Sequence, residues 1–275
     1  NLEDIKKIIN EVKHKSLMIA QTPHTFSGIE VALLDLLGKK EQCPIYSLLG
    51  DIKTTPKIAY ASVLFGKTAQ ETFDLGKSIK EKNFRAIKFG WQNFGKNIKL
   101  DEEHITAARE SIGDELHLMI DVGAVWGTNV EEAEKRNNLF KNSKITWLEE
   151  PFYSDAFFEY SELYKKTNLP LAGGESCHSV ESAKNMIRYG KVKFIQIDAG
   201  IAGGIIAGKE ICDFAEKSDV QYVNHTFTSH LQLSASLQPY ANSSKSVFAE
   251  FPQQLKPLAW DLTENHINLN ENGNI

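Results

Sequence analysis

The sequence predicts an α/β protein built around a closed barrel of parallel strands, and three observations support this prediction. From Lys57 onward, short β-branched apolar runs alternate with amphipathic helical patterns, as in parallel strands joined by right-handed crossovers. The runs, such as Phe194–Ile197, are almost continuously apolar, which is typical of strands covered on both faces. Eight such runs in roughly 200 residues fit a closed barrel better than an open sheet. An open dinucleotide-binding sheet is the alternative, and it is disfavoured because no Gly-x-Gly-x-x-Gly follows the first run.

The expected elements follow one another in strict alternation. The predicted strands are Lys57–Phe65, Ala86–Trp91, His117–Val122, Ile145–Glu149, Pro170–Gly174, Val192–Ile197, Val220–Asn224 and Ser246–Ala249. The predicted helices between them are Gln70–Lys82, Glu102–Ile112, Val130–Phe140, Phe157–Lys166, Val180–Tyr189, Ile205–Glu216 and Leu231–Ala241. Nearly continuous apolar runs indicate the strands, and amphipathic patterns indicate the helices between them.

The two ends of the chain do not continue this alternation. Ile5–Val12 and Ile29–Leu37 are two helical patterns that precede the first strand, and they are expected to belong to a second packed unit. The segment Leu255–Ile275 is rich in Asn and Leu and could return to that unit. The first residue is not Met and the last four, Asn-Gly-Asn-Ile, resemble a turn, so we expect a piece of a longer protein.

Composition excludes several classes of protein. The 275 residues are 41% hydrophobic and 24% charged, with a net charge of −5 and no markedly basic stretch. These values indicate a globular chain and argue against nucleic acid or an anionic membrane as a partner. No apolar run approaches the roughly 20 residues of a membrane span. The three cysteines, Cys43, Cys177 and Cys212, are too few and too scattered for a disulfide framework, which favours a reduced, cytoplasmic location.

Every predicted strand from the second onward ends in ionisable residues. In chain order these are Lys88, Asp121, Glu149, Glu175, Asp198, His225 and Glu250. From Asp121 onward they recur at intervals of 23 to 28 residues, which is one strand–helix unit each. Because the carboxyl ends of barrel strands converge on one mouth, we expect these side chains to share one site.

Three of these residues predict a metal site. Asp121, Glu149 and Glu175 lie on consecutive strands and offer carboxylate oxygens to one point. Hard oxygen ligands suit Mg²⁺, whereas zinc would require His or Cys. Any one of them could be an ordinary N-cap or surface acid, but three like charges this close together need a cation.

The opposite side of the mouth predicts a proton-transfer pair. Asp198 and His225, on adjacent strands, would place a carboxylate beside an imidazole, orienting it and raising its basicity. Lys88 could bind an anionic substrate group, act as a base, or only pair with a metal-binding carboxylate.

Weaker candidates also lie near the mouth. They are His24 and His178 in loops, Cys177 without an activating base, Trp91 and Trp126 as walls of the rim, and Gly203-Gly204 before a helix. The glycine pair could cradle a phosphate, although a tight strand-to-helix turn explains it equally well.

Taken in order and spacing, these residues resemble the enolase superfamily, in its mandelate racemase and muconate lactonizing enzyme branch. The marks of the resemblance are Asp121, Leu148-Glu149-Glu150-Pro151, Gly174-Glu175, Asp198, Gly203-Gly204, His225 and Glu250, together with Ser27–Lys39 and Pro44–Gly50 before the barrel. The resemblance implies a modified TIM barrel, (β/α)7β, with only part of an α+β capping domain present. It assigns residues 1–56 to the capping domain and linker, 57–252 to the barrel, and 253–275 to a segment that returns to the capping domain.

The resemblance also implies chemistry: a Mg²⁺-dependent enzyme removes the α-proton of a small carboxylate substrate and forms an enediolate. The metal ligands would be Asp121, Glu149 and Glu175. His225 and Asp198 would form the catalytic dyad, and Lys88 and Glu250 would contact the substrate carboxylate. We expect a homo-oligomer.

Two departures from the family pattern bear on the reaction. Racemases of the family carry Lys-x-Lys on the second strand, whereas this chain has Lys88-Phe89-Gly90. With His225 as the one base, dehydration of a sugar acid by a hydro-lyase is the favoured reaction. A racemase or epimerase that uses Lys88, and a non-catalytic metal-binding barrel, are the alternatives. The second departure is Val122-Gly123, where relatives often place a polar residue, and this removes a possible substrate contact.

Overall fold

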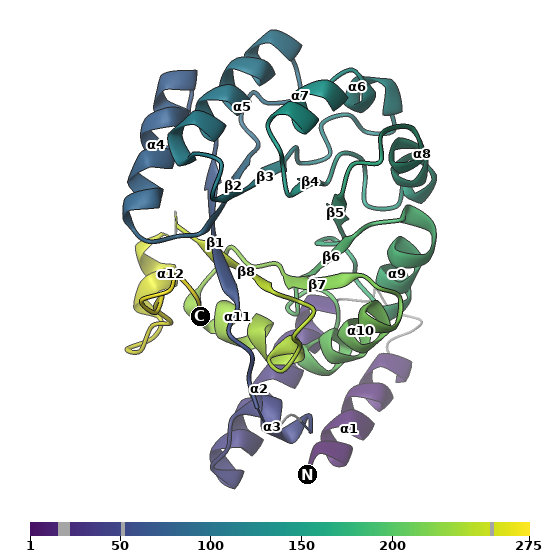
Figure 1. Ribbon diagram of the computed structural model, residues 1–275. Helices are drawn as coiled ribbons and strands as arrows, with labels where there is room; N and C mark the ends of the chain where they lie inside the picture. Colours follow the sequence, from purple (N-terminus) through teal and green to yellow (C-terminus); the bar gives the residue numbers. More distant parts are fainter. Residues whose placement is uncertain (16–22, 51–52, 254–255) are drawn as a thin grey trace.

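Eight parallel strands form the centre of the protein (Figure 1). The computed structural model describes residues 1–15, 23–50, 53–253 and 256–275. The strands are β1 (Ile58–Leu64), β2 (Ala86–Gly90), β3 (His117–Asp121), β4 (Trp147–Glu149), β5 (Leu171–Gly173), β6 (Phe194–Ile197), β7 (Gln221–Asn224) and β8 (Phe248–Pro252). Neighbours in space follow the order β7-β6-β5-β4-β3-β2-β1-β8. All eight expected strands are confirmed.

The barrel is nearly closed, and side chains join its two end strands. The carboxamide of Asn224 on β7 spans the gap to β8, since its Oδ1 accepts the Glu250 amide at 2.9 Å and its Nδ2 donates to the Glu250 carbonyl at 3.3 Å. The Tyr222 amide donates to Ser246 Oγ at 2.9 Å. These bonds bring His225 and Glu250 to the same rim.

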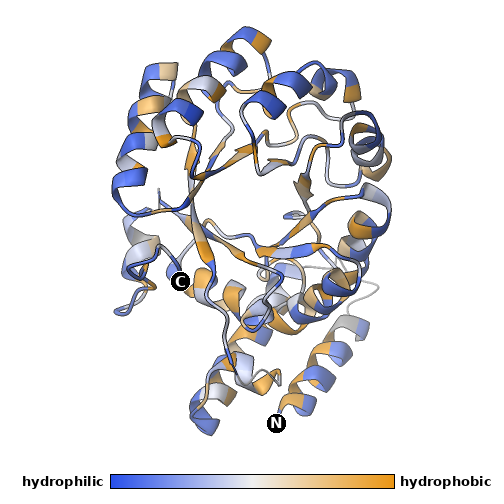
Figure 2. Ribbon diagram, in the orientation of Figure 1, coloured by the Kyte–Doolittle hydropathy of each residue, from blue (hydrophilic) through white to orange (hydrophobic). Residues whose placement is uncertain are grey.

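Helices surround the strands. They are α4 (Ala69–Glu81), α5 (Ile98–Ile112), α6 (Val130–Glu134), α7 (Asn137–Asn142), α8 (Phe157–Thr167), α9 (Val180–Asn185), α10 (Ile205–Lys217), α11 (His230–Leu237) and α12 (Pro257–Asp261). Side-chain caps begin several of them: Thr68, Asn97 and Ser229 each accept a backbone N–H of the first turn, which supplies partners for amides that have none within the helix. Hydrophobic residues on these helices turn toward the strands and hydrophilic ones turn outward (Figure 2).

Several expected elements differ from the structure. The helix expected over Leu231–Ala241 ends at Leu237 and continues as a 3-10 turn, Gln238–Tyr240. The helix expected over Val130–Phe140 is two helices, because Arg136 leaves the helical conformation and its guanidinium is buried against Asp101 at 2.7 Å. The helix expected over Val180–Tyr189 ends at Asn185 and continues as a π-helical turn, Met186–Gly190. The last strand lies two residues later than Ser246–Ala249, so that Glu250 is inside the strand, with Phe248 and Glu250 on its inner side.

The floor of the barrel is an apolar layer directly below the charged residues. Tyr60, Trp147, Phe194 and Phe248 pack there, and the ring centroids of Trp147 and Phe194 are 4.7 Å apart. A larger core fills the space between the strands and the surrounding helices. The charged mouth therefore lies on a packed interior, as in other parallel barrels.

The amino-terminal helices α1 (Leu2–Lys15), α2 (Pro23–Glu41) and α3 (Ile45–Leu48) pack beside α10 (Figure 1). Glu30 of α2 is fully buried, and its carboxylate accepts the Ile205 and Ile206 amides at 2.9 and 2.7 Å. At the other end of the chain, Ile275 and Lys57 exchange two backbone hydrogen bonds of 2.9 Å at the start of β1. The domain boundaries, and the return of residues 253–275 to a capping domain, stay predictions.

None of the helices in the described parts of the chain has the length and apolarity needed to cross a bilayer.

Candidate active site

The structure brings the seven predicted residues together at the carboxyl ends of the strands. Lys88, Asp121, Glu149 and Glu250 lie on β2, β3, β4 and β8, and Glu175, Asp198 and His225 follow β5, β6 and β7. Ion-pair distances join them into one cluster. All except Glu175 are buried, and Glu175 is half-buried.

Asp121, Glu149 and Glu175 are spaced as metal ligands. One carboxylate oxygen from each lies within 4.8 Å of the other two. Burial, with the charge of Glu149, raises the pKa of Asp121 well above its usual range. Burial, with the charges of Glu150 and Glu149, raises the pKa of Glu175 to about 7, against the attraction of His225. Three buried oxygens that repel one another fit a hard divalent cation such as Mg²⁺, which would keep water or substrate on its remaining positions.

Lys88 lies between the acids. Its Nζ contacts a Glu149 oxygen, lies 2.8 Å from Glu250 Oε1 and lies 3.7 Å from Asp121 Oδ2. Burial opposes the charge, but Glu149 and Glu250 outweigh it and raise the pKa of Lys88 well above its usual range. A lysine held in this way is a fixed cation at the mouth.

His225 connects the two sides of the site. Its Nδ1 lies 3.1 Å from Asp198 Oδ2, and its Nε2 lies 3.5 Å from Glu175 Oε2. The other Asp198 oxygen accepts Gln232 Nε2 and the Gly200 amide, both at 2.7 Å, so the carboxylate that orients the ring is itself fixed. Burial opposes protonation of His225, but the charges of Glu175 and Glu250 and the bond to Asp198 raise its pKa to about 10.

Glu250 is held as a carboxylate by its neighbours. It accepts the Thr226 amide at 2.8 Å and pairs with Lys88. Burial works against its charge, but Lys88 and His225 lower its pKa below the usual value.

Among the weaker candidates, Trp91 contacts the cluster, whereas Trp126 donates Nε1 to the Gly95 carbonyl at 2.8 Å. His24 and His178 are exposed. Burial raises the pKa of the Cys177 thiol to about 12, which keeps it protonated and unreactive. The turn at Gly203-Gly204 receives a carboxylate of the chain itself, because a Cβ on Gly204 would lie 2.4 Å from Glu30 Oε2. This side chain occupies the place that a phosphate would need.

The sequence indicated Trp91 only as a wall of the rim, and it did not indicate the support that Trp91, Trp147 and Glu150 give the cluster. Trp91 Nε1 donates to Asp121 Oδ2 at 3.1 Å, and Trp147 Nε1 donates to Glu149 Oε2 at 2.8 Å. Glu150 accepts the Tyr160 hydroxyl at 2.6 Å and the Gly174 amide at 2.7 Å, just before Glu175. The only signal for Trp91 and Trp147 was their position near a strand end, which does not show the direction of an indole N–H.

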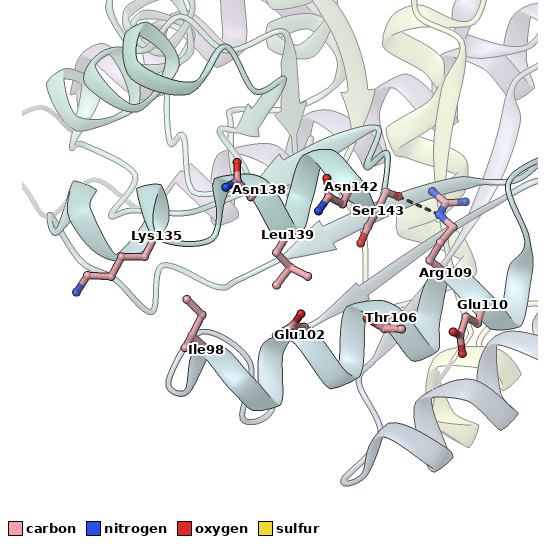
Figure 3. Close-up of a pocket in the computed structure, with 10 residues that line it drawn as sticks. All are labelled: Ile98, Glu102, Thr106, Arg109, Glu110, Lys135, Asn138, Leu139, Asn142 and Ser143. Carbon is pink, nitrogen blue, oxygen red and sulfur yellow. Dashed lines mark hydrogen bonds between the residues drawn. The ribbon is translucent and has the colours of Figure 1, made fainter.

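A separate groove of about 440 Å³ lies outside the barrel, between α5 and the α6–α7 segment (Figure 3). Arg109 on its wall donates to the carbonyls of Ser143, Gly113, Leu116 and Lys144. Its guanidinium is therefore engaged in holding the barrel loops, and none of the seven residues at the mouth lines this groove.

Known proteins are similar to this chain in sequence and in fold. The family model described as enolase C-terminal domain-like matches residues 72–273. D-galactarolactone cycloisomerase of Agrobacterium fabrum is 30% identical over 216 residues, which are 77% of this chain and 56% of that protein. L-talarate/galactarate dehydratase of Salmonella typhimurium is 26% identical over 262 residues, which are 92% of this chain and 64% of that protein. A crystal structure from Rhodobacter sphaeroides, named as a predicted mandelate racemase, superposes with a TM-score of 0.94 at 40% identity and covers 99% of this chain and 70% of that one.

The chain spans little more than half the length of the first of these curated relatives and 64% of the second. The matched family model covers most of the barrel and the following tail. This protein therefore belongs to the enolase superfamily, with the carboxyl-terminal barrel of the mandelate racemase and muconate lactonizing enzyme branch.

Proposed function

We propose that this barrel carries the catalytic residues for Mg²⁺-dependent removal of an α-proton from a carboxylate substrate, in the dehydration of a sugar acid to a 2-keto-3-deoxy acid. The observation that supports this best is the position of His225, fixed by Asp198 and facing Glu175 of the acidic triad. An imidazole oriented in this way beside a cation site is suited to proton transfer at the carbon next to a carboxylate.

The residues of the chain divide the steps between them. Lys88 is the positive charge that would pair with the substrate carboxylate. A cation that compensates the charge of Glu175 would remove the attraction that contributes most to the raised pKa of His225. In its neutral form His225 Nε2 takes the α-proton, and Asp198 at Nδ1 stabilises the resulting imidazolium. His225 then returns that proton to the β-hydroxyl as the carbon–oxygen bond breaks, releasing water and an enol that becomes the 2-keto acid.

The cation site supplies charge stabilisation. Mg²⁺ held by Asp121, Glu149 and Glu175 would stabilise negative charge on the substrate oxygens. Glu250, fixed by the Thr226 amide, would hydrogen-bond the same carboxyl group.

Racemisation is disfavoured because it needs a second base on the other face of the substrate. Gly90 occupies the position of the second lysine, and a Cβ there would lie 2.9 Å from the Asp121 Cβ. Lys88 is paired with Glu149 and Glu250, so it is a poor base. Proton transfer on one face by His225 is the consistent alternative.

A cycloisomerase is a second candidate, because a 30% identical relative is named D-galactarolactone cycloisomerase. The same α-proton removal by His225 would then open a ring instead of expelling water. Product mass separates the two reactions, since an isomerase conserves mass and a dehydratase product has lost one water.

To test this, a library of sugar acids and their lactones is incubated with the protein and Mg²⁺ in ²H₂O. Two quantities are measured: the 2-keto products formed, and the deuterium incorporated at the α-carbon of the substrate. Wild-type protein should form product and exchange deuterium, and His225→Asn should lose both by about 10²- to 10⁴-fold, the usual contribution of a general base. Exchange that persists in His225→Asn would place the base elsewhere, with Lys88 the first residue to test. Cation binding without exchange or turnover would favour the non-catalytic barrel.

A homo-oligomeric state and a cytoplasmic location stay predictions, and the first can be measured by light scattering of the purified chain.

A further inference from the structure

Trp91 is unusual among the residues at the mouth. It is 54% exposed, although it is a large hydrophobic residue. Trp91 and the next residue, Gln92, both have left-handed backbones, with φ of 62° and 58°. Non-glycine residues adopt this region at a cost, and such strain concentrates at functional sites. The unfavourable backbone conformation of Trp91 therefore indicates a role for its side chain.

Two glycines make room for the interaction between Trp91 and Asp121. A Cβ on Gly123 would lie 3.0 Å from the Trp91 ring, and a Cβ on Gly90 would lie 2.9 Å from the Asp121 Cβ. Gly123 also donates its amide to Asp121 Oδ1 at 2.9 Å. The two departures from the family pattern, at Gly90 and at Gly123, are thus both explained by the packing of Trp91 and Asp121.

A second indole makes the same kind of contact with the next ligand. Trp147 Nε1 donates to Glu149 Oε2 at 2.8 Å from the barrel floor, where Trp147 is fully buried. Trp91 Nε1 donates to Asp121 Oδ2 from the rim. One indole from each side therefore fixes one oxygen of each of two neighbouring carboxylates.

We propose that Trp91 is a positioning residue for the divalent cation site. Its indole N–H holds Asp121 in place, as the indole N–H of Trp147 holds Glu149. This inference rests on the proposed cation site and extends it to a residue outside the ligand set. A donor that fixes a ligand carboxylate restricts the directions of its free lone pairs, and losing such an outer partner weakens metal binding.

The test compares Mn²⁺ binding, measured by electron paramagnetic resonance, in wild-type protein, Trp91→Phe and Trp260→Phe. Phenylalanine keeps an aromatic ring but removes the N–H. Trp91→Phe should bind Mn²⁺ about 10-fold more weakly, by analogy with other outer-shell partners. Trp260 is a matched control because it is 42% exposed and lies on α12, and its variant should bind like wild type.

A second measurement needs no variant at the site. The chain has four tryptophans, and their indole N–H resonances can be followed during a Mg²⁺ titration. The two that donate to Asp121 and Glu149 should shift. Those of Trp126, which donates to the Gly95 carbonyl, and of Trp260 should stay in place.

The outcomes separate this inference from the proposed function. If Trp91→Phe binds Mn²⁺ with unchanged affinity, or if the Trp91 indole resonance does not shift when Mg²⁺ is added, the role of Trp91 is overturned. The proposed cation site is not affected by either result. Wild-type protein that binds no Mn²⁺ overturns both the cation site and the role of Trp91.

Discussion

Buried carboxylates occur in two settings in this barrel, and they differ in how their charge is compensated. Asp101 on α5 is fully buried, and it accepts Arg136 Nε at 2.7 Å and the Gly95 amide at 2.8 Å. Glu30 is likewise buried and accepts two amides at the start of α10. Each of these acids has its donors within the chain.

The mouth of the barrel differs because acids outnumber cations there. Asp121, Glu149, Glu175, Asp198 and Glu250 form one cluster with Lys88 and His225. Five acids face two basic groups, so negative charge remains. Burial, together with this charge, raises the pKa of Asp121 and Glu175. Burial of unbalanced charge costs stability unless a ligand compensates it. This difference distinguishes the carboxylates that support the fold from those that can bind a cation.

The largest expected effect is on cation binding, after loss of one ligand at the mouth. Glu149→Gln should reduce Mn²⁺ affinity by more than the 10- to 100-fold typical of an outer-shell partner, and should abolish turnover while the circular dichroism spectrum stays that of wild type. Glu162→Gln, at an exposed glutamate of α8, is the control. Wild-type affinity in Glu149→Gln would remove this residue from the ligand set.

The same type of change at a structural acid should affect stability instead. Asp101→Asn removes the buried carboxylate that accepts Arg136 Nε, while Glu132 stays 3.0 Å from the guanidinium at the half-buried side. Breaking a buried pair costs about 3 kcal/mol or more. Urea unfolding measures this loss, and Mn²⁺ affinity should not change. Asp114→Asn is the control, since Asp114 pairs with Lys144 on the surface, 2.7 Å away, where such pairs contribute about 0 to 1 kcal/mol. Similar losses in the two variants would contradict the distinction between the two settings.

The sequence predicted the strands well because a parallel strand buried on both faces has a strong local signal. The same regularity placed an ionisable residue at each strand end, so the mouth cluster could be predicted from Asp121 to Glu250. Helix breaks were less predictable, because the break at Arg136 depends on Asp101, a partner 35 residues away. The roles of Gly90 and Gly123 were missed for the same reason: each glycine is required by a side chain from a neighbouring strand or its loop.

The charge imbalance at the mouth also predicts a pH-dependent effect of Mg²⁺. Glu175, with a pKa raised to about 7, keeps its proton in the folded chain between about pH 4.5 and 7 while the unfolded chain loses it, so stability falls as pH rises through that range. His225, with a pKa raised to about 10, contributes fully below about pH 6.5 and loses its contribution as pH rises toward 10.

Both groups therefore make the cation-free protein less stable in alkaline solution, where Mg²⁺ would bind best. At about pH 8.5, Mg²⁺ at 100 times its Kd should add about 2.7 kcal/mol to the free energy of unfolding, whereas the same concentration at about pH 5 should add much less. Thermal unfolding with and without Mg²⁺ at both pH values checks this. An equal gain in Tm at both would show that the acids do not compete with protons for the cation.

The smallest expected effect concerns the contact between α2 and α10. Glu30→Gln keeps the shape of the side chain but removes the charge that faces the amides of Ile205 and Ile206. A carboxylate at a helix amino terminus contributes up to about 2 kcal/mol in a partly buried geometry, so we expect a loss of about 1 kcal/mol in urea unfolding and faster hydrogen exchange at those two amides. Glu41→Gln, at the exposed end of α2, should change neither.

Mn²⁺ affinity should be retained in Glu30→Gln, because this acid is compensated by the helix and has no part in the excess charge at the mouth. Weaker Mn²⁺ binding in that variant would show that the packing of α2 reaches the active site.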